Sequence, residues 1–215
     1  MSTFKELKDR VIALVDDDSL NTLIGSFINQ GVDEIAGGVH SALLDVISPP
    51  LPNLFVIDTV TTDIAAAYVN MPTTYQRNLQ LAVSAKGSEI DISNSFIEFS
   101  ETYPALSKVG NISEVIEQGG KLYYQGIPST EEILTLHFYR KPVIMVDDDD
   151  EPDGIPEHLH MSLLSNFAAW KANEFLEDGV EGETPNTLKY KSFFTDALKI
   201  LELTIPYDSR GLMLR

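Results

Sequence analysis

The chain has 215 residues, an apolar content of 43% and a net charge of −18. This length and composition predict one large or two small globular domains with a packed core, rather than a disordered chain. The sequence has no cysteine, which excludes disulfides, a thiolate nucleophile and zinc–thiolate sites.

The acidic charge argues against binding to duplex DNA or to an anionic membrane, because both need basic side chains at phosphates. The acidic charge either keeps the protein soluble or forms a surface past which DNA moves without adhering. No window contains the roughly 18 apolar residues that a membrane span needs. The first residues also lack the apolar segment of a signal peptide, so we expect a soluble product of the cytoplasm.

The first fifty residues have the apolar period of helices. Thr3 and Glu6 form a capping-box pattern at the start of one helix. Residues 16–19 interrupt the period, and Asp18 or Ser19 is the expected cap of a second helix with apolar positions from 20 to 35. A short helical continuation over residues 43–47 is a further option, before three prolines at 49, 50 and 52 end it.

From about residue 54 to 146 the apolar period becomes two, as in β-strands. The expected strands are residues 55–61, 68–69, 79–83, 90–92, 96–99, 122–125 and 133–139. Residues 108–120 are ambiguous, with a helical turn as one option at 115–119. Seven or eight short strands at this spacing predict an antiparallel sandwich or barrel.

After the acidic residues 147–153 the helical period returns. Pro156 suits the first position of a helix. Phe167 and Trp170 share its apolar face, which predicts Trp170 in the core. The last helix begins near Pro185 and ends before Pro206. Its apolar positions are Tyr190, Phe193, Phe194, Ala197, Leu198 and Leu201.

These periods predict an α+β fold in which the N- and C-terminal helices form one bundle, with an inserted antiparallel β-sandwich or barrel-like domain. The expected parts are a helical bundle of residues 1–50 and 155–205 and an inserted β domain of residues 51–150 that ends in an acidic loop. Residues 206–215 form a C-terminal tail.

No pattern of catalytic or cofactor-binding residues stands out. The chain lacks a Gly-x-Ser-x-Gly elbow and a glycine-rich phosphate loop. His158 and His160 are two residues apart and would point about 160° apart on a helix, which argues against a shared metal. We predict no catalytic residue, cofactor or metal site. Paired carboxylates among the 33 acidic residues leave a hydrolase as an alternative.

The acidic loop partly matches a calcium-binding loop. With Gly154 as the loop glycine, Asp149, Glu151 and Asp153 take the first, third and fifth positions, but His160 stands where a bidentate Glu is required. Weak divalent binding of another kind is one interpretation. The other is a solvated, mobile loop whose like charges repel and which folding does not need.

Several segments together resemble the head-to-tail adaptor proteins of tailed bacteriophages, also called head completion or portal–tail connector proteins. They are residues 68–72, 74–77, 98–99 with 103–104, 122–128, 134–142 and 154–159. The resemblance rests on their order and spacing and covers most of the chain.

The resemblance implies a structural virion protein at the head–tail junction, made in the host cytoplasm. Such adaptors bind beneath the portal protein as a cyclic homo-oligomeric ring, extend the DNA channel and provide the docking surface for a nozzle or tail-tube protein. Genome DNA passes through the lumen without specific binding, and no membrane is involved. The alternatives from other classes are a small cytoplasmic carboxylate-dependent hydrolase and a binding module.

The tail carries apolar residues that a free chain end does not need. It either folds back on its own helices or forms an arm that inserts into the portal or a neighbouring subunit. The arm's expected contacts are Tyr207, Leu212 and Leu214 as apolar anchors, with Arg210 and Arg215 pairing with acidic groups. The adaptor resemblance favours the arm, because the family's C-terminal extension commonly reaches the portal.

Overall fold

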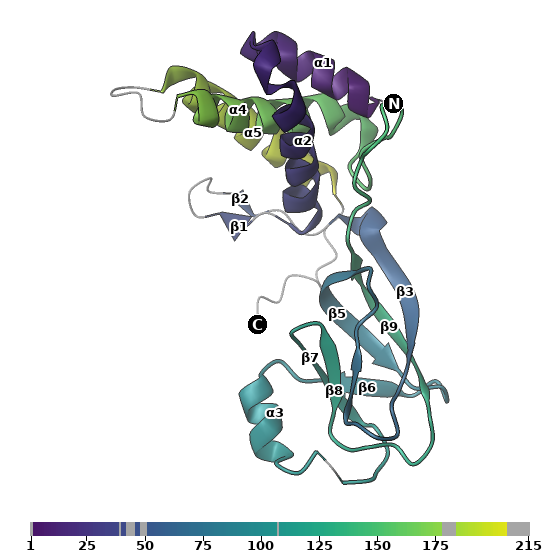
Figure 1. Ribbon diagram of the computed structural model, residues 1–215. Coiled ribbons are helices and arrows are strands. Elements are labelled where there is room, and N and C mark those ends of the chain that lie inside the picture. Colours follow the sequence, from purple (N-terminus) through teal and green to yellow (C-terminus); the bar gives the residue numbers. More distant parts are fainter. Residues whose placement is uncertain are drawn as a thin grey trace. The chain divides into compact units, whose positions relative to one another are not determined.

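The structure is a computed structural model that describes residues 2–38, 40–41, 46–47, 51–106, 108–177 and 184–205 (Figure 1). The fold is α+β, as predicted, and divides into two compact units. A helical unit contains the described residues up to Leu54 and from Lys141 to Ile205, and a sheet unit contains Phe55–Arg140. Within these ranges no helix combines the length and the apolar character that a membrane crossing requires.

The helical unit contains four α-helices, which are α1 (Phe4–Val15), α2 (Asn21–Ala36), α4 (Asn166–Leu176) and α5 (Pro185–Thr204). Three 3-10 turns, η1 (Asp18–Leu20), η2 (Pro52–Leu54) and η3 (Glu157–Leu159), and one π turn, η4 (Met161–Ser165), flank them. Strands β1 (His40–Ser41) and β2 (Val46–Ile47) pair in an antiparallel sheet.

Helices from the two ends of the sequence contact one another. On α2, a Cβ atom added at Gly31 would lie 2.8 Å from Cδ1 of Phe167 on α4, so the glycine permits a close approach. The hydroxyl of Tyr190 on α5 donates to the carbonyl of Leu14 on α1 over 3.0 Å. The side chains of Leu7, Ile24, Ile28, Leu163, Phe167, Phe194 and Leu198 are fully buried.

The capping box at the start of α1 is confirmed. Thr3 Oγ1 accepts from the N–H of Glu6, and the Thr3 N–H donates to the Glu6 carboxylate. The expected cap of α2 is wrong, because Leu20 precedes α2 without a capping side chain. Asp17 instead accepts from the N–H of Ser19 at 2.8 Å and stabilises η1. Residues 46–47 form a strand rather than a helical continuation.

The helix after Pro156 begins later than expected. The chain first forms η3 and then the π turn η4, so regular α-helix starts only at Asn166. Leu163 within the π turn and Phe167 after it are both fully buried. Trp170, also expected in the core, is only half-buried, and its ring centroid lies 5.7 Å from that of Phe167.

The sheet unit is one curled, open sheet of seven strands in the order β3-β9-β5-β6-β7-β8-β4 (Figure 1). The strands are β3 (Phe55–Thr61), β4 (Tyr68–Asn70), β5 (Tyr75–Val83), β6 (Glu89–Ile92), β7 (Glu114–Gln118), β8 (Lys121–Tyr124) and β9 (Ile133–Arg140). Strand β5 bends where Asn78 has φ 58° and the register with β9 shifts. Buried side chains such as Tyr124, Leu136 and Phe138 form the core on one face.

The predicted antiparallel sandwich or barrel is wrong in one respect, because the sheet is mixed. Strands β6 and β7 pair in parallel. A parallel pair needs a crossover connection, and α3 (Phe96–Thr102) lies within it. Residues 96–99, expected as a strand, begin this helix because Ser95 caps it by accepting from the N–H of Glu98. Residues 115–118 lie in β7 and not in a helical turn.

Polar side chains inside the sheet unit fasten its connections. The carboxylate of Glu114 accepts from the hydroxyls of Ser93 and Tyr103, so it ties both ends of the crossover together. The hydrogen bond to Glu114 raises the pKa of Tyr103. The hydroxyl of Tyr124 accepts from the N–H of Asp63 at 2.9 Å and donates to the carbonyl of Ala66 at 2.8 Å.

Candidate functional site

The predicted partner contacts Tyr207, Arg210, Leu212, Leu214 and Arg215 all lie outside the described residues. Their role stays a prediction. Three features of the helical unit are candidate interaction sites: the acidic loop of residues 147–153, a concavity between α1, η4 and α5, and an exposed apolar stripe on α5.

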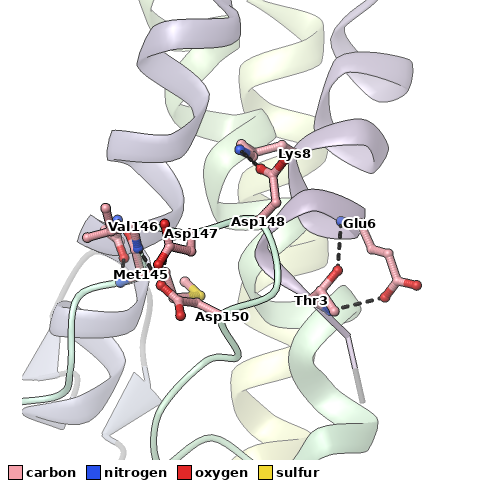
Figure 2. A network of polar contacts seen from close by, with 9 residues as sticks. Thr3, Glu6, Lys8, Met145, Val146, Asp147, Asp148 and Asp150 are labelled. Atoms are coloured by element: carbon pink, nitrogen blue, oxygen red, sulfur yellow. Dashed lines mark hydrogen bonds and ion pairs between the residues drawn. The ribbon is translucent and has the colours of Figure 1, made fainter.

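The acidic loop fastens the start of α1 (Figure 2). The backbone N–H groups at the start of a helix have no partner within the helix. Here the N–H of Phe4 donates to the carbonyl of Asp150 at 2.7 Å, and that of Lys5 donates to the carbonyl of Asp148 at 3.0 Å. The ammonium of Lys8 pairs with the Asp148 carboxylate at 2.7 Å. With the capping box, every N–H from Phe4 to Leu7 then has an acceptor.

Two carboxylates hold the loop's own backbone. Asp150 accepts from the N–H groups of Val146 and Asp147 at 2.7 and 2.8 Å, and these hydrogen bonds lower its pKa. Asp153 accepts from the N–H of Val143 at 2.9 Å. The hydrogen bond and charge of Lys8 lower the pKa of Asp148. These contacts stabilise a segment in which six of seven residues are acidic.

The six carboxylates therefore divide into two groups of three. Asp148, Asp150 and Asp153 hold the loop in place. Asp147, Asp149 and Glu151 are exposed and have no side-chain partner in the part of the chain that the structure describes. Exposure to solvent is thus confirmed for most of the loop, but the interpretation as a mobile loop overlooked its contacts with α1.

The residues before the loop expose three apolar side chains. Met145 is buried, and its N–H and carbonyl both bond to the side-chain amide of Asn29 on α2, at 3.0 and 2.9 Å. Its neighbours Val143, Ile144 and Val146 are 65%, 69% and 76% exposed. We call residues 143–149 the strap. It presents apolar side chains, followed by the free carboxylates of Asp147 and Asp149, on a backbone fixed at both ends.

The concavity has a volume of about 420 Å³. It is lined by Arg10, Leu14, Met161, Ser162, Ser165, Asn166, Lys189, Tyr190 and Phe193. Neither Arg10 nor Lys189 forms an ion pair with any described residue. Phe193, expected in the core, is 47% exposed and forms part of the wall. The ammonium of Lys189 lies over the ring of Tyr190, 4.9 Å from its centroid. The concavity therefore combines two cations that have no carboxylate partner among the described residues with an apolar surface.

The helix α5 carries apolar side chains on two faces. Tyr190, Phe194 and Leu198 are buried within the unit. On the other face Phe193, Ile200 and Leu203 are 47%, 50% and 88% exposed, and they share one stripe at a turn of about 100° per residue. Phe193 belongs both to this α5 stripe and to the wall of the concavity. A helix with apolar side chains on two faces is typical of one that packs on both sides.

The calcium-loop alignment has a structural explanation instead. Gly154 has φ 80°, and a Cβ added there would lie 2.9 Å from Cγ of Leu54, so the position demands glycine for packing and backbone reasons. His160 is buried, with Nε2 2.9 Å from the carbonyl oxygen of Ile155. Among the described residues no three ligands of the His, Cys, Asp or Glu type are grouped to hold a metal ion.

Two described histidines have structural contacts: His160 bonds to the carbonyl of Ile155, and the ring of His137 lies 6.0 Å from that of Phe55. Sequence reasoning missed the concavity, because Arg10, Met161 and Lys189 are far apart in the chain. The exposure of Phe193 was missed too, since Phe193 fits the helical apolar pattern of the last helix.

Comparison with known families gives one result. The sequence profile of the SU10 adaptor protein family matches residues 2–212. The match spans both units and most of the tail. A search of curated proteins found no match.

Proposed function

The chain belongs to the SU10 adaptor protein family, and from this membership we propose that it binds beneath the portal as a ring, extends the DNA channel and presents the docking surface for the tail. Membership in a phage adaptor family implies a structural component of the virion, in agreement with the resemblance seen in the sequence. The match over residues 2–212 is the observation that carries the proposal.

The charge supports a place beside passing DNA. A net charge of −18 repels phosphates, so an adaptor ring made of this chain would let DNA slide through without adhering. The exposed apolar side chains support an assembled state. Leu203 on α5 and Val146 in the strap are 88% and 76% exposed, and each has further exposed apolar side chains on its own element.

In this proposal the tail is the arm that reaches the portal. Tyr207, Leu212 and Leu214 serve as apolar anchors, and Arg210 and Arg215 pair with acidic groups of the portal or of a neighbouring subunit. An arm of this kind orders on binding, so its affinity depends on the partner's presence.

The test uses phage heads that contain the portal but lack the adaptor. The purified full-length chain is added, unbound protein is removed by sedimentation, and the portal vertex is imaged by electron microscopy. The expected result is a ring of added density at that vertex. Heads that acquire no protein and no added density at the vertex would contradict the proposal.

The arm is tested by truncation after Ile205, because the side chain of Ile205 is buried and an earlier truncation would remove it. The truncated chain should keep the melting temperature of the full chain, because an arm of this kind orders only on binding, and it should fail to bind the heads. The matched control replaces Asp208 and Ser209 with Asn and Ala in the full chain, which keeps the anchors and should bind normally. Loss of folding on truncation, or undiminished binding without the tail, would refute the arm.

A further inference from the structure

Three features of the helical unit have complementary chemistry. The strap presents three exposed apolar side chains and then two free carboxylates. The concavity presents two cations that form no ion pair with a described residue, and the α5 stripe presents exposed apolar side chains. The ammonium of Lys189 lies 4.9 Å from the centroid of the Tyr190 ring and carries no carboxylate partner among the described residues.

The strap of one copy cannot occupy the concavity of the same copy. Lys8 on α1 holds Asp148 of the strap at 2.7 Å. Arg10, which lines the concavity, follows Lys8 by two residues and so lies about 200° further round the helix. The strap and the concavity therefore lie on opposite faces of α1, so a strap reaches a concavity only in another copy of the chain.

The order of the groups also matches. Along the strap, apolar positions 143–146 precede the carboxylates of Asp147 and Asp149. Along α5 the cation Lys189 precedes Phe193 and Ile200. Val143 and Val146 are three residues apart and span at most about 10 Å, and Phe193 and Ile200 are seven helical residues apart, also about 10 Å. The groups of the strap match those of α5 in order when the strap and α5 run in opposite directions.

We infer that the strap of one copy docks along the α5 stripe of the next copy and places Asp147 and Asp149 beside Arg10 and Lys189 in its concavity. The contact joins two different surfaces, so it is head-to-tail and can repeat around a closed ring. Val146 lies against Phe193, and the carboxylates find cations in a partly enclosed site. This inference deepens the proposed function, because it rests on the ring and names the surfaces that join its subunits.

The strap is suited to this role because its shape is set before binding. Asn29 fixes Met145, and Asp150 fixes the backbone of Val146 and Asp147. Little conformational freedom is then lost on docking, which favours affinity. The two groups of carboxylates then have different roles. Asp148, Asp150 and Asp153 hold the strap, and Asp147 and Asp149 face the neighbouring copy.

The experiment reverses charges in the full-length chain. One variant carries Arg10→Glu and Lys189→Glu, and a second carries Asp147→Lys and Asp149→Lys. Ring formation is measured by analytical ultracentrifugation over rising protein concentration and by imaging on portal-containing heads. Each variant alone should assemble about tenfold or more weakly, because like charges then face each other across the contact. Circular dichroism checks that each variant is folded.

An equimolar mixture of the two variants is the decisive measurement. In an alternating ring every strap again meets a concavity of opposite charge, so the mixture should recover assembly. A control with Lys86→Glu and Lys199→Glu has the same change in net charge as the variant with Arg10→Glu and Lys189→Glu, with one exposed substitution in each unit, and should assemble normally.

The outcomes separate this inference from the proposed function. If the unaltered chain forms no ring, alone or on heads, the proposed function fails. If it forms rings that both reversed variants also form, the function stands and the strap contact is wrong. Weakened variants that the mixture does not rescue, or a control that is weakened as much as they are, would also overturn the strap contact.

Discussion

The two units hold their connections in different ways. In the sheet unit, Tyr124 is fully buried and its hydroxyl ties a connection to the core face of the sheet. In the helical unit the acidic loop is held by charged groups at the surface, and the buried polar residues of this unit are His160, Ser165 and Asn173. Losing a hydrogen-bond partner costs more free energy when the polar group is buried, whereas exposed ion pairs contribute little. The loss of the Tyr124 hydroxyl should therefore cost more stability than the loss of charges in the acidic loop, and the loss of apolar volume at Phe167 should cost the most.

The largest effect is expected at Phe167. The change Phe167→Ala should lower the free energy of unfolding by about 3–5 kcal/mol, because it leaves a cavity where α2, α4 and α5 meet. Trp170→Ala should cost clearly less, since Trp170 is only half-buried. Denaturant unfolding of both variants measures the difference. An equal loss in both would show that Trp170 belongs to the core after all.

Removal of one hydroxyl sharpens the comparison for the sheet unit. Tyr124→Phe should lower the free energy of unfolding by about 1–3 kcal/mol, because the N–H of Asp63 and the carbonyl of Ala66 lose their partner. Tyr123→Phe is the matched control on the same strand and should change stability by less than about 0.5 kcal/mol. Equal effects of the two substitutions would mean that the hydroxyl of Tyr124 does not matter.

A single methyl group tests the close approach of α2 and α4. Gly31→Ala adds a Cβ 2.8 Å from the ring of Phe167, and such overpacking costs about 1–3 kcal/mol. The higher helix propensity of alanine offsets about 1 kcal/mol of this. Thermal unfolding should show a net loss. Ser26→Ala, at an exposed position of α2, should show none. A stabilised Gly31→Ala protein would mean that the two helices are further apart.

The smallest effect is expected at the acidic loop, and it depends on pH. Folding lowers the pKa of both Asp148 and Asp150. Their ionised forms therefore stabilise the folded state above the ordinary Asp pKa of 3.8, and this contribution disappears as the pH falls through the lower folded pKa. Asp148→Asn with Asp150→Asn should lower the melting temperature at pH 7, and the difference from the unaltered chain should vanish in acid.

The matched control for the loop is Asp149→Asn. Asp149 has no partner among the residues described, so its loss of charge should leave the melting temperature unchanged or raise it through weaker repulsion. If Asp149→Asn destabilises the chain as much as the double substitution does, the division of the loop into two groups of carboxylates is wrong. Replacing all of residues 147–150 should now be destabilising, in contrast to the expectation from the sequence.

Local signals in the sequence were enough for most elements. The capping box of Thr3 and Glu6 was predicted because both partners lie within one turn. The strand at residues 133–139 and the family resemblance were predicted from short contiguous patterns. The α3 helix was missed because Ile97 and Phe99, which flank Glu98, fit the alternation of a strand as well as a helix. The cap of Ser95 on the N–H of Glu98 was the local signal for the helix that sequence reasoning overlooked, and the network around Glu114 joins the crossover that contains it.

The sequence by itself determined the α+β class, the succession of a helical, a strand-rich and a second helical region, and membership in an adaptor family, since these depend on periodicity and on short motifs in a set order. Only the tertiary structure decided which acidic side chains are free, because Asp147 and Asp148 are alike in sequence but only Asp148 lies against Lys8, 140 residues away. It also brought Arg10, Met161 and Lys189 to one concavity. Such contacts depend on how distant segments pack, and no pattern along the chain encodes that directly.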